Sequence, residues 1–258
     1  FDGEVQLKVT LKIAELARNQ LGDRELAREY YTKALELQAD DRTALVALES
    51  LYEEAGDGPR LLEILERRVE AAESDGERKE LLFRRARLLA EVLEERSQAI
   101  DVYVSILDLE LDPAAISALI DLYSKAERWD ELIELYQRQL DAAPDDAAKL
   151  RVAVAQVAAE KLNDLARAFD EIEAALDEDA NYEAAIAVLE RWLTDAPEAE
   201  HRARAASLLE PVYLRRGEFS KVMTTISARL EFSQDPEERR ELLTRLAQLY
   251  EEQEENYA

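Results

Sequence analysis

One arrangement of side chains recurs along this sequence and restricts the folds open to it. A small residue, an aromatic residue, a second small residue and a leucine stand at offsets 0, +4, +7 and +8, as Ala27, Tyr31, Ala34 and Leu35. On an α-helix these offsets form a single stripe. The stripe returns from Ala99 and again from Ala168, at steps of 72 and 69 residues. Small residues let a second helix approach closely, so the stripe predicts helices packed on helices.

A second pattern lies between these copies and completes the repeat. Leu48 and Tyr52 begin it, and it returns around Tyr123, 71 residues after Tyr52, and in degraded form around Tyr213. Two alternating patterns at a nearly fixed step are typical of an array of helical hairpins, each of roughly 34–36 residues. We therefore expect roughly fourteen or fifteen helices in antiparallel pairs and no β-sheet.

These units resemble tetratricopeptide repeats. In "LGDRELAREYYTKALELQADD", Gly22 and Asp23 make the turn between two helices, and the stripe from Ala27 occupies the family's positions on the second helix of a pair, helix B. The second pattern matches the end of the first helix, helix A, through Leu48-x3-Tyr52-x3-Gly56-Asp57. The family's proline after helix B is absent, with Ala39 in its place, and no unit carries the full signature.

The resemblance covers nearly the whole chain and implies a fold. It implies an all-α, right-handed superhelical solenoid of antiparallel helix pairs, whose helix-A faces line a concave groove for a protein or peptide partner. A solenoid of helical pairs with longer units is the alternative fold.

Composition agrees with a helical solenoid and excludes several functions. Six glycines and six prolines in 258 residues leave little room for long loops. The formal net charge of −26 would repel phosphates, so we expect no nucleic-acid partner. No stretch free of charged residues reaches the ~18 residues that a membrane helix needs, so we expect no membrane insertion. Cysteine is absent, which is compatible with the cytoplasm, slightly favoured, and with the periplasm.

The repeat step is broken once. From Tyr123 to Tyr213 it is 90 residues, and the excess around residues 181–200 indicates one additional helix ending at Pro197. Pro211 then disfavours helix at Glu210. We therefore expect three parts: residues 1–180 as an array of about five helix pairs, residues 181–217 as an irregular insertion with an extra helix and a proline-containing helix, and residues 218–258 as a further, truncated unit.

The C-terminal stretch also carries information about the repeat. "LLTRLAQLYEEQEENYA" aligns with "LLFRRARLLAEVLEERS", so the sequence stops where the next helix B should begin. Repeat arrays normally end in a polar cap. We therefore expect this chain to be part of a larger polypeptide or assembly.

The sequence offers no convincing catalytic or metal-binding residues. Asp177, Asp179 and Asn181 open like an EF-hand loop, but Tyr182 replaces the glycine that such a loop needs. His201 is the only histidine, and one histidine without cysteine cannot build a zinc site, so we expect it on a helix surface. We therefore predict no catalytic residue, no cofactor and no metal.

Two kinds of function remain. One is a non-catalytic scaffold that binds a peptide or protein in a concave groove of mixed charge. The other is a helical superstructure of a larger enzyme whose catalytic domain lies outside this segment. The family's groove positions, together with Trp192 as an exposed aromatic anchor, give ten candidate partner-binding residues. They are Lys12, Glu15, Asn19, Arg84, Arg87, Glu91, Gln156, Glu160, Trp192 and Arg245.

Overall fold

The computed structural model describes residues 3–142, 144–196 and 198–257. These residues form fourteen α-helices and no β-strand, which confirms the predicted all-α array of helix pairs. The helices belong to two compact units, Phe1–Arg128 and Trp129–Ala258. The predicted division of the chain after residues 180 and 217 stays a prediction.

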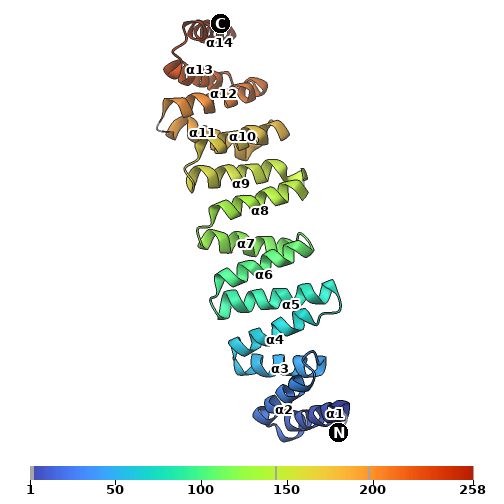
Figure 1. The fold of residues 1–258 in the computed structure, drawn as a ribbon. Helices are drawn as coiled ribbons and strands as arrows, with labels where there is room; N and C mark the ends of the chain where they lie inside the picture. The colour runs from blue at the N-terminus through green and yellow to red at the C-terminus, as the bar shows by residue number, and fades with distance from the viewer. Residues whose placement is uncertain (1–2, 143, 197, 258) are drawn as a thin grey trace. The chain divides into compact units, whose positions relative to one another are not determined.

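Unit 1 consists of short helices that follow one another along the chain (Figure 1). Each helix packs against the next, and the short turns between them make neighbours antiparallel. The helices are α1 (Gly3–Leu16), α2 (Arg24–Leu37), α3 (Arg42–Ala55), α4 (Gly58–Glu70), α5 (Asp75–Arg87), α6 (Arg96–Leu109) and α7 (Pro113–Lys125).

Unit 2 is built in the same way. Its helices are α8 (Trp129–Ala142), α9 (Ala147–Glu160), α10 (Leu165–Glu178), α11 (Glu183–Asp195), α12 (Ala199–Arg216), α13 (Phe219–Phe232) and α14 (Pro236–Tyr257), with a 3₁₀ turn at Pro144–Asp146. Helix α11 occupies the segment in which the sequence predicts an extra helix. Pro197, the predicted end of that helix, lies outside the described residues.

The turns inside the helix pairs share one backbone feature. Each contains a residue in the left-handed conformation, with φ between 55° and 69°: Gly22, Gly56, Glu94, Glu127, Asn163 and Gly217. The first five are 33 to 38 residues apart, whereas the last step is 54 residues. The long step contains the additional helix, so the backbone itself records both the repeat and its single interruption.

The turn residues also explain where the second helix of each pair begins. The carboxylate of Asp23 accepts a hydrogen bond from the amide of Leu26 at 3.0 Å, and Asp164 accepts one from Arg167 at 3.0 Å. A side chain of this kind satisfies an amide that the first helical turn leaves without a partner. The sequence prediction of a helix stop and start at Gly22 and Asp23 is confirmed.

Helices α1 and α5 end in a wider final turn than an α-helix has. Residues Ala17–Leu21 (η1) and Leu88–Val92 (η2) are π-helical. The amides of Asp23 and Glu95 reach back to the carbonyls of Ala17 and Leu89, at 2.9 and 2.8 Å. Such wide turns are rare and frequently occur at functional sites.

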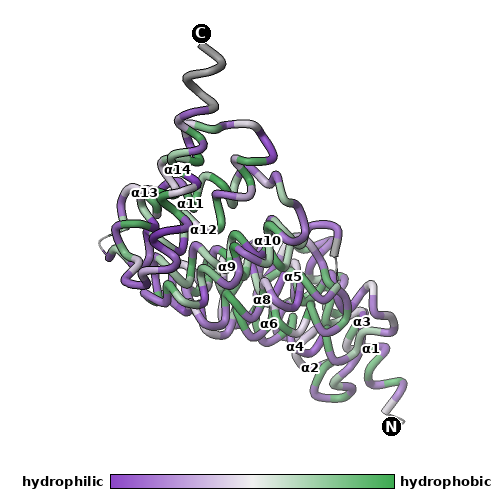
Figure 2. The backbone as a smooth tube through the Cα atoms, turned by 90° about the horizontal axis from the view of Figure 1, so that it is seen from above, coloured by the Kyte–Doolittle hydropathy of each residue, from purple (hydrophilic) through white to green (hydrophobic). Residues whose placement is uncertain are grey.

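The predicted stripes form the core of the helix pairs. Ala27 and Ala34 are fully buried, and Tyr31 is 4% exposed. The matching stripe in α6 is equally buried, with Tyr103 packed edge-on against Phe83 at 6.1 Å between ring centroids. Green and purple segments alternate along the helices in Figure 2, as expected for helices with one apolar side.

Pro211 does not interrupt its helix. The prediction that it disfavours helix at Glu210 is wrong, because α12 is continuous with Pro211 inside it. An interior proline costs ~3 kcal/mol. Leu209 and Val212 on either side are buried, and the buried Glu210 binds two arginines, so tertiary contacts outweigh this cost.

Candidate functional site

Polar side chains connect the first helices of three pairs in unit 1. Arg18, at the end of α1, donates a hydrogen bond to Ser50 of α3 at 2.9 Å. Arg84 of α5 forms an ion pair with Glu53 of α3 at 3.2 Å. These contacts place α1, α3 and α5 side by side. We call this surface the helix-A face and define it by Lys12, Glu15, Asn19, Ser50, Glu53, Arg84, Arg87 and Glu91.

Some predicted binding residues on this face already have partners within the chain. Lys12 binds Glu15 at 2.7 Å, and Arg84 binds both Glu53 and the buried Glu49. A partner molecule would have to compete with these contacts. The helix-A face carries both charges, and part of that charge is neutralised by pairs within the chain.

Other predicted residues on the same face remain available. Asn19 and Glu91 are exposed, and among the described residues neither side chain forms a hydrogen bond or an ion pair. Arg87 is exposed as well, but its guanidinium contacts the Tyr103 hydroxyl and stands 6.0 Å from the centre of the Phe83 ring. Asn19 lies in η1 and Glu91 in η2, at the ends of two neighbouring helices A.

The predicted partner-binding residues of unit 2 differ in their exposure to solvent. Gln156 and Glu160 are exposed on α9, and Glu160 pairs with Arg191 of α11 at 2.9 Å. Trp192 is 7% exposed, so the prediction of an exposed anchor is wrong. Its ring packs against Phe169 at 4.6 Å between centroids, because α11 turns its apolar side into the core of unit 2.

Glu49 of α3 is a buried carboxylate that joins three helices. It is 4% exposed and pairs with Arg68 at the end of α4 and with Arg84 of α5. Burying a carboxylate without a partner costs free energy. The two guanidinium partners of Glu49 therefore hold α4 and α5 against α3. Arg84 is therefore bound from within, and it is a poorer partner-binding residue than the sequence predicts.

Unit 2 contains the same arrangement. Glu210 of α12 is 3% exposed, and its two carboxylate oxygens accept from Arg229 of α13 at 2.8 Å and from Arg245 of α14 at 2.6 Å. The arginines follow the glutamate by 19 and 35 residues, as they do after Glu49. Arg245, predicted as a partner-binding residue, thus contacts a buried acid of its own chain.

Sequence reasoning missed both glutamates, although a signal for them exists. Glu49 and Glu210 each stand directly after a buried leucine and three residues before a tyrosine, inside an apolar segment. A carboxylate there is unusual unless it is paired. The arginines at the same two offsets would have identified the partners.

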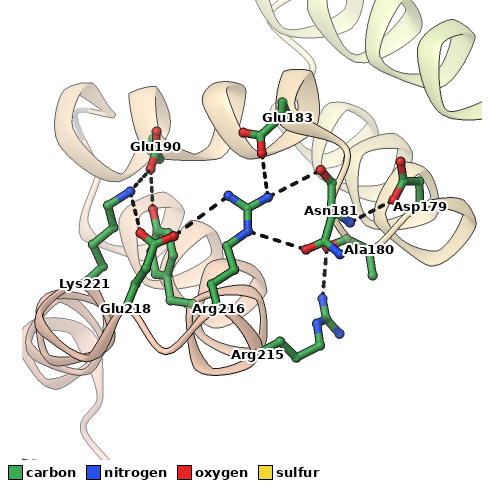
Figure 3. A network of polar contacts seen from close by, with 10 residues as sticks. Asp179, Ala180, Asn181, Glu183, Glu190, Arg215, Arg216, Glu218 and Lys221 are labelled. Atoms are coloured by element: carbon green, nitrogen blue, oxygen red, sulfur yellow. Dashed lines mark hydrogen bonds and ion pairs between the residues drawn. The ribbon is translucent and has the colours of Figure 1, made fainter.

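The segment before α11 is tied to α12 and α13 by a polar network (Figure 3). Arg216 of α12 pairs with Glu183 at 2.8 Å and contacts Asn181. Glu190 accepts a hydrogen bond from the Tyr213 hydroxyl at 2.7 Å and pairs with Lys221 of α13 at 3.0 Å. These contacts connect the extra helix to the helices that follow it.

The same network shifts two pKa values. Burial, followed by the hydrogen bond to Glu190, raises the pKa of Tyr213 well above its ordinary value of 10.0. The hydrogen bond from Tyr213 and then the one from Lys221 hold the pKa of Glu190 below its ordinary value of 4.5. Both pKa shifts reflect a structural contact. The neutral hydroxyl of Tyr213 and the ionised carboxylate of Glu190, the forms present at neutral pH, stabilise each other.

Asp179 and His201, considered above as metal ligands, contact other groups of the chain. Asp179 accepts from the amide of Asn181 at 3.0 Å, and Asp177 is exposed. His201 stacks on Phe169 at 6.1 Å and its side chain is 24% exposed, so it is more buried than predicted. Across the described residues, no group of three or more His, Cys, Asp or Glu side chains could hold a metal ion.

A separate hollow lies on the second helices of unit 1. It has a volume of about 990 Å³ and is lined by α2, α3 and α4, with Leu35, Tyr52 and Ile64 among its apolar residues. The cations Arg28, Lys33, Arg60 and Arg67 at its edge each pair with an acid three or four residues away. No pattern in the sequence indicated this hollow.

The fold and these surfaces define a class of protein: an all-α repeat protein, of the kind that generally serves as a scaffold for protein interactions. A family model described as tetratricopeptide repeat matches residues 44–79 and 115–150. The chain is therefore a helical repeat protein, two segments of which match the tetratricopeptide repeat. No helix in the described part of the chain is long and apolar enough to span a membrane.

Comparison with known proteins gives several structural neighbours. The search of curated proteins finds no match. The crystal structure of YrrB, a TPR protein with an unusual peptide-binding site, is 18% identical, covers 70% of this chain and 90% of its own, and has a TM-score of 0.37. The crystal structure of MamA protein is 20% identical, with coverages of 69% and 95% and a TM-score of 0.37. A tetratricopeptide repeat protein from Parabacteroides merdae ATCC 43184 is 20% identical, with coverages of 92% and 83% and a TM-score of 0.35.

Proposed function

We propose that this chain is a non-catalytic scaffold that binds an extended or helical peptide segment of a partner protein on the helix-A face of unit 1. The observation that carries the proposal is the set of exposed polar groups at the ends of α1 and α5. Asn19, Arg87 and Glu91 are exposed there and supply an amide, a cation and an anion. A peptide of mixed charge could form charge-assisted hydrogen bonds with all three.

Exposed apolar side chains occur on the same helix ends. Leu21 in η1 is 71% exposed and Val92 in η2 is 61% exposed. Single exposed ion pairs contribute only ~0–1 kcal/mol, so binding would need apolar contacts as well. These two residues could supply them, which supports the choice of this part of the face.

The internal pairs decide which substitutions can test the proposal. Arg84 is unsuitable, because a carboxylate in its place would stand beside the buried Glu49. Arg87→Glu removes an exposed cation, whose contacts within the chain are with Phe83 and Tyr103, and reverses its charge. Arg78→Glu is the matched control, since Arg78 is exposed on the same helix and nine residues away, which places it on the opposite side.

A phage-displayed library of random peptides would be selected on the wild-type chain, and enriched peptides measured by calorimetry. We expect peptides with both charges and an apolar anchor, with affinity at least about fivefold weaker for Arg87→Glu and unchanged for Arg78→Glu. Equal affinities for wild type and Arg87→Glu, with helical content intact, would place the binding surface elsewhere.

A further inference from the structure

Helix α3 forms the centre of the helix-A face, with α1 on one side and α5 on the other. Ser50 and Glu53 belong to the outward side of α3, and Thr43 and Val46 extend this side toward the start of the helix, at spacings of three or four residues. Val46 is 45% exposed although its helix has a neighbour on each side. The middle of the face therefore offers an apolar contact next to polar groups.

The cations beside this centre are less exposed than the acid at the centre. Arg18 of α1 binds Ser50 at 2.9 Å and Glu54 at 3.7 Å, and its side chain is 32% exposed. The side chain of Arg84, from α5, is 36% exposed and binds one oxygen of Glu53. Glu53 is 62% exposed, and its other oxygen forms no hydrogen bond or ion pair among the residues that the structure describes. A molecule that approaches the centre therefore reaches a carboxylate more easily than a guanidinium.

The buried Glu49 accounts for this difference. One terminal nitrogen of Arg84, Nη1, binds Glu49, and the other, Nη2, binds Glu53. Glu49 is 4% exposed, and a carboxylate so deeply buried cannot give up a cationic partner without a large cost in free energy. An acid of a partner would have to compete with Glu49 for Arg84. A cation of a partner would compete only with an exposed ion pair, which contributes ~0–1 kcal/mol.

We propose that the partner segment places a lysine or arginine at Glu53 and an apolar side chain at Val46, and that Glu49 is the positioning residue that makes this centre select a cation. The two contact residues are seven positions apart on α3, which corresponds to ~10 Å. An extended segment spans this distance in about three residues, so its basic and apolar residues stand about three positions apart. The inference rests on the proposed function and adds the place of the basic residue, while an acid of the same segment is left for Arg87.

The test uses the whole chain and two pools of short peptides that are blocked at both ends. Each peptide carries a leucine, and three positions away a lysine in one pool or a glutamate in the other. All remaining positions are random among uncharged residues. The pools are captured on the immobilised chain at low salt and quantified by mass spectrometry. We expect the wild-type chain to retain the lysine pool at least about fivefold better than the glutamate pool.

Two surface variants, each with a matched control, test the contact residues. Glu53→Gln should abolish the preference for lysine. Glu63→Gln should keep it, because Glu63 is also exposed and paired with an arginine, Arg67, but lies on α4. Val46→Ser should lower retention of the lysine pool at least about threefold, through the lost apolar contact. Leu37→Ser should not, since Leu37 is similarly exposed, at 42%, but lies at the end of α2.

A third variant tests the positioning role of the buried acid. Glu49→Gln leaves Arg84 without its buried partner, so the preference for lysine should fall at least about threefold. Glu210→Gln removes the equivalent acid of unit 2 and should leave the preference unchanged. The ratio of the two pools is the readout, because a loss of stability alone would lower the retention of both. If Glu49→Gln does not keep its helical content, Glu53→Gln still decides the proposal.

Hydrogen exchange with the retained peptides separates this inference from the proposed function. Equal retention of both pools, or a lysine preference that persists in Glu53→Gln, would overturn the inference. If the peptides still slow exchange at residues 43–54 and 84–93, the helix-A face remains the binding surface and only its selection of a cation is wrong. If they slow exchange at neither segment, the proposed function fails as well.

Discussion

Replacing Glu210 by glutamine should destabilise unit 2 although it changes almost no volume. The carboxylate is 3% exposed and accepts from Arg229 at 2.8 Å and Arg245 at 2.6 Å. Hydrogen bonds to charged groups contribute ~1.5–3 kcal/mol each, and breaking a buried ion pair costs ~3–5 kcal/mol. The arginines keep 25% and 44% exposure, so water can solvate them once the acid is gone. We therefore expect Glu210→Gln to cost ~2–3 kcal/mol.

The opposite truncation should cost more. With Arg229→Met and Arg245→Met together, the buried carboxylate stays and has lost both partners, so we expect the upper end of ~3–5 kcal/mol. The triple variant that adds Glu210→Met removes the charge altogether and should recover most of that loss, because apolar replacements of buried ion pairs are often neutral.

The measurement is urea unfolding combined with native-state hydrogen exchange. Glu210→Gln should lower protection first in α12, α13 and α14, the three helices that the carboxylate joins. Asp170→Asn is the control, because it removes an exposed pair with Arg204 and should change stability by no more than ~1 kcal/mol. If Glu210→Gln unfolds like wild type and the exchange pattern is unchanged, the reasoning about buried carboxylates in this fold is refuted.

Three further predictions concern single residues. Tyr31→Ala should lower the free energy of unfolding by ~3–5 kcal/mol in urea titration, because the side chain is 4% exposed, and an unchanged midpoint would contradict its place in the core. Glu94→Gly should raise that free energy by ~0.5–1 kcal/mol, because Glu94 has φ = 58°; a loss of stability would argue against the left-handed turn. Since contacts hold the pKa of Glu190 below 4.5, its stabilisation should be complete above that pH and decrease as the pH falls further. Glu190→Gln should make thermal stability less dependent on pH in this acidic range, and an identical pH profile would show that its contacts contribute nothing.

Patterns of apolar and small residues sufficed to predict the helix pairs. The stripe from Ala27 is local, since four side chains within one helix determine which side of that helix is buried. Gly22 and Asp23 are equally local, because the left-handed turn and the cap involve only their own neighbours. Such features follow from periodicity and backbone conformation alone, and the structure confirms them.

The binding candidates depended on contacts between helices, and there the prediction was weaker. Arg84 and Arg245 lie on their helices as expected, but whether they are available depends on Glu49 and Glu210, which are 35 residues away in sequence. Trp192 has no equivalent in the repeat pattern, so that pattern offered no reason to place it in the core. To predict which side chains pair between two helices, one must know how the helices are aligned with each other. The periodicity within one helix does not provide that alignment.

The most direct test of the proposed scaffold function is hydrogen-exchange mass spectrometry of the chain with a peptide selected from the library. We predict that the peptide slows exchange at residues 16–23 and 84–93, where Asn19, Arg87 and Glu91 lie, and leaves exchange in α2 and α4 unchanged. Slower exchange confined to α2 and α4, whose residues line the hollow on the second helices, would contradict the assignment of the helix-A face as the binding surface.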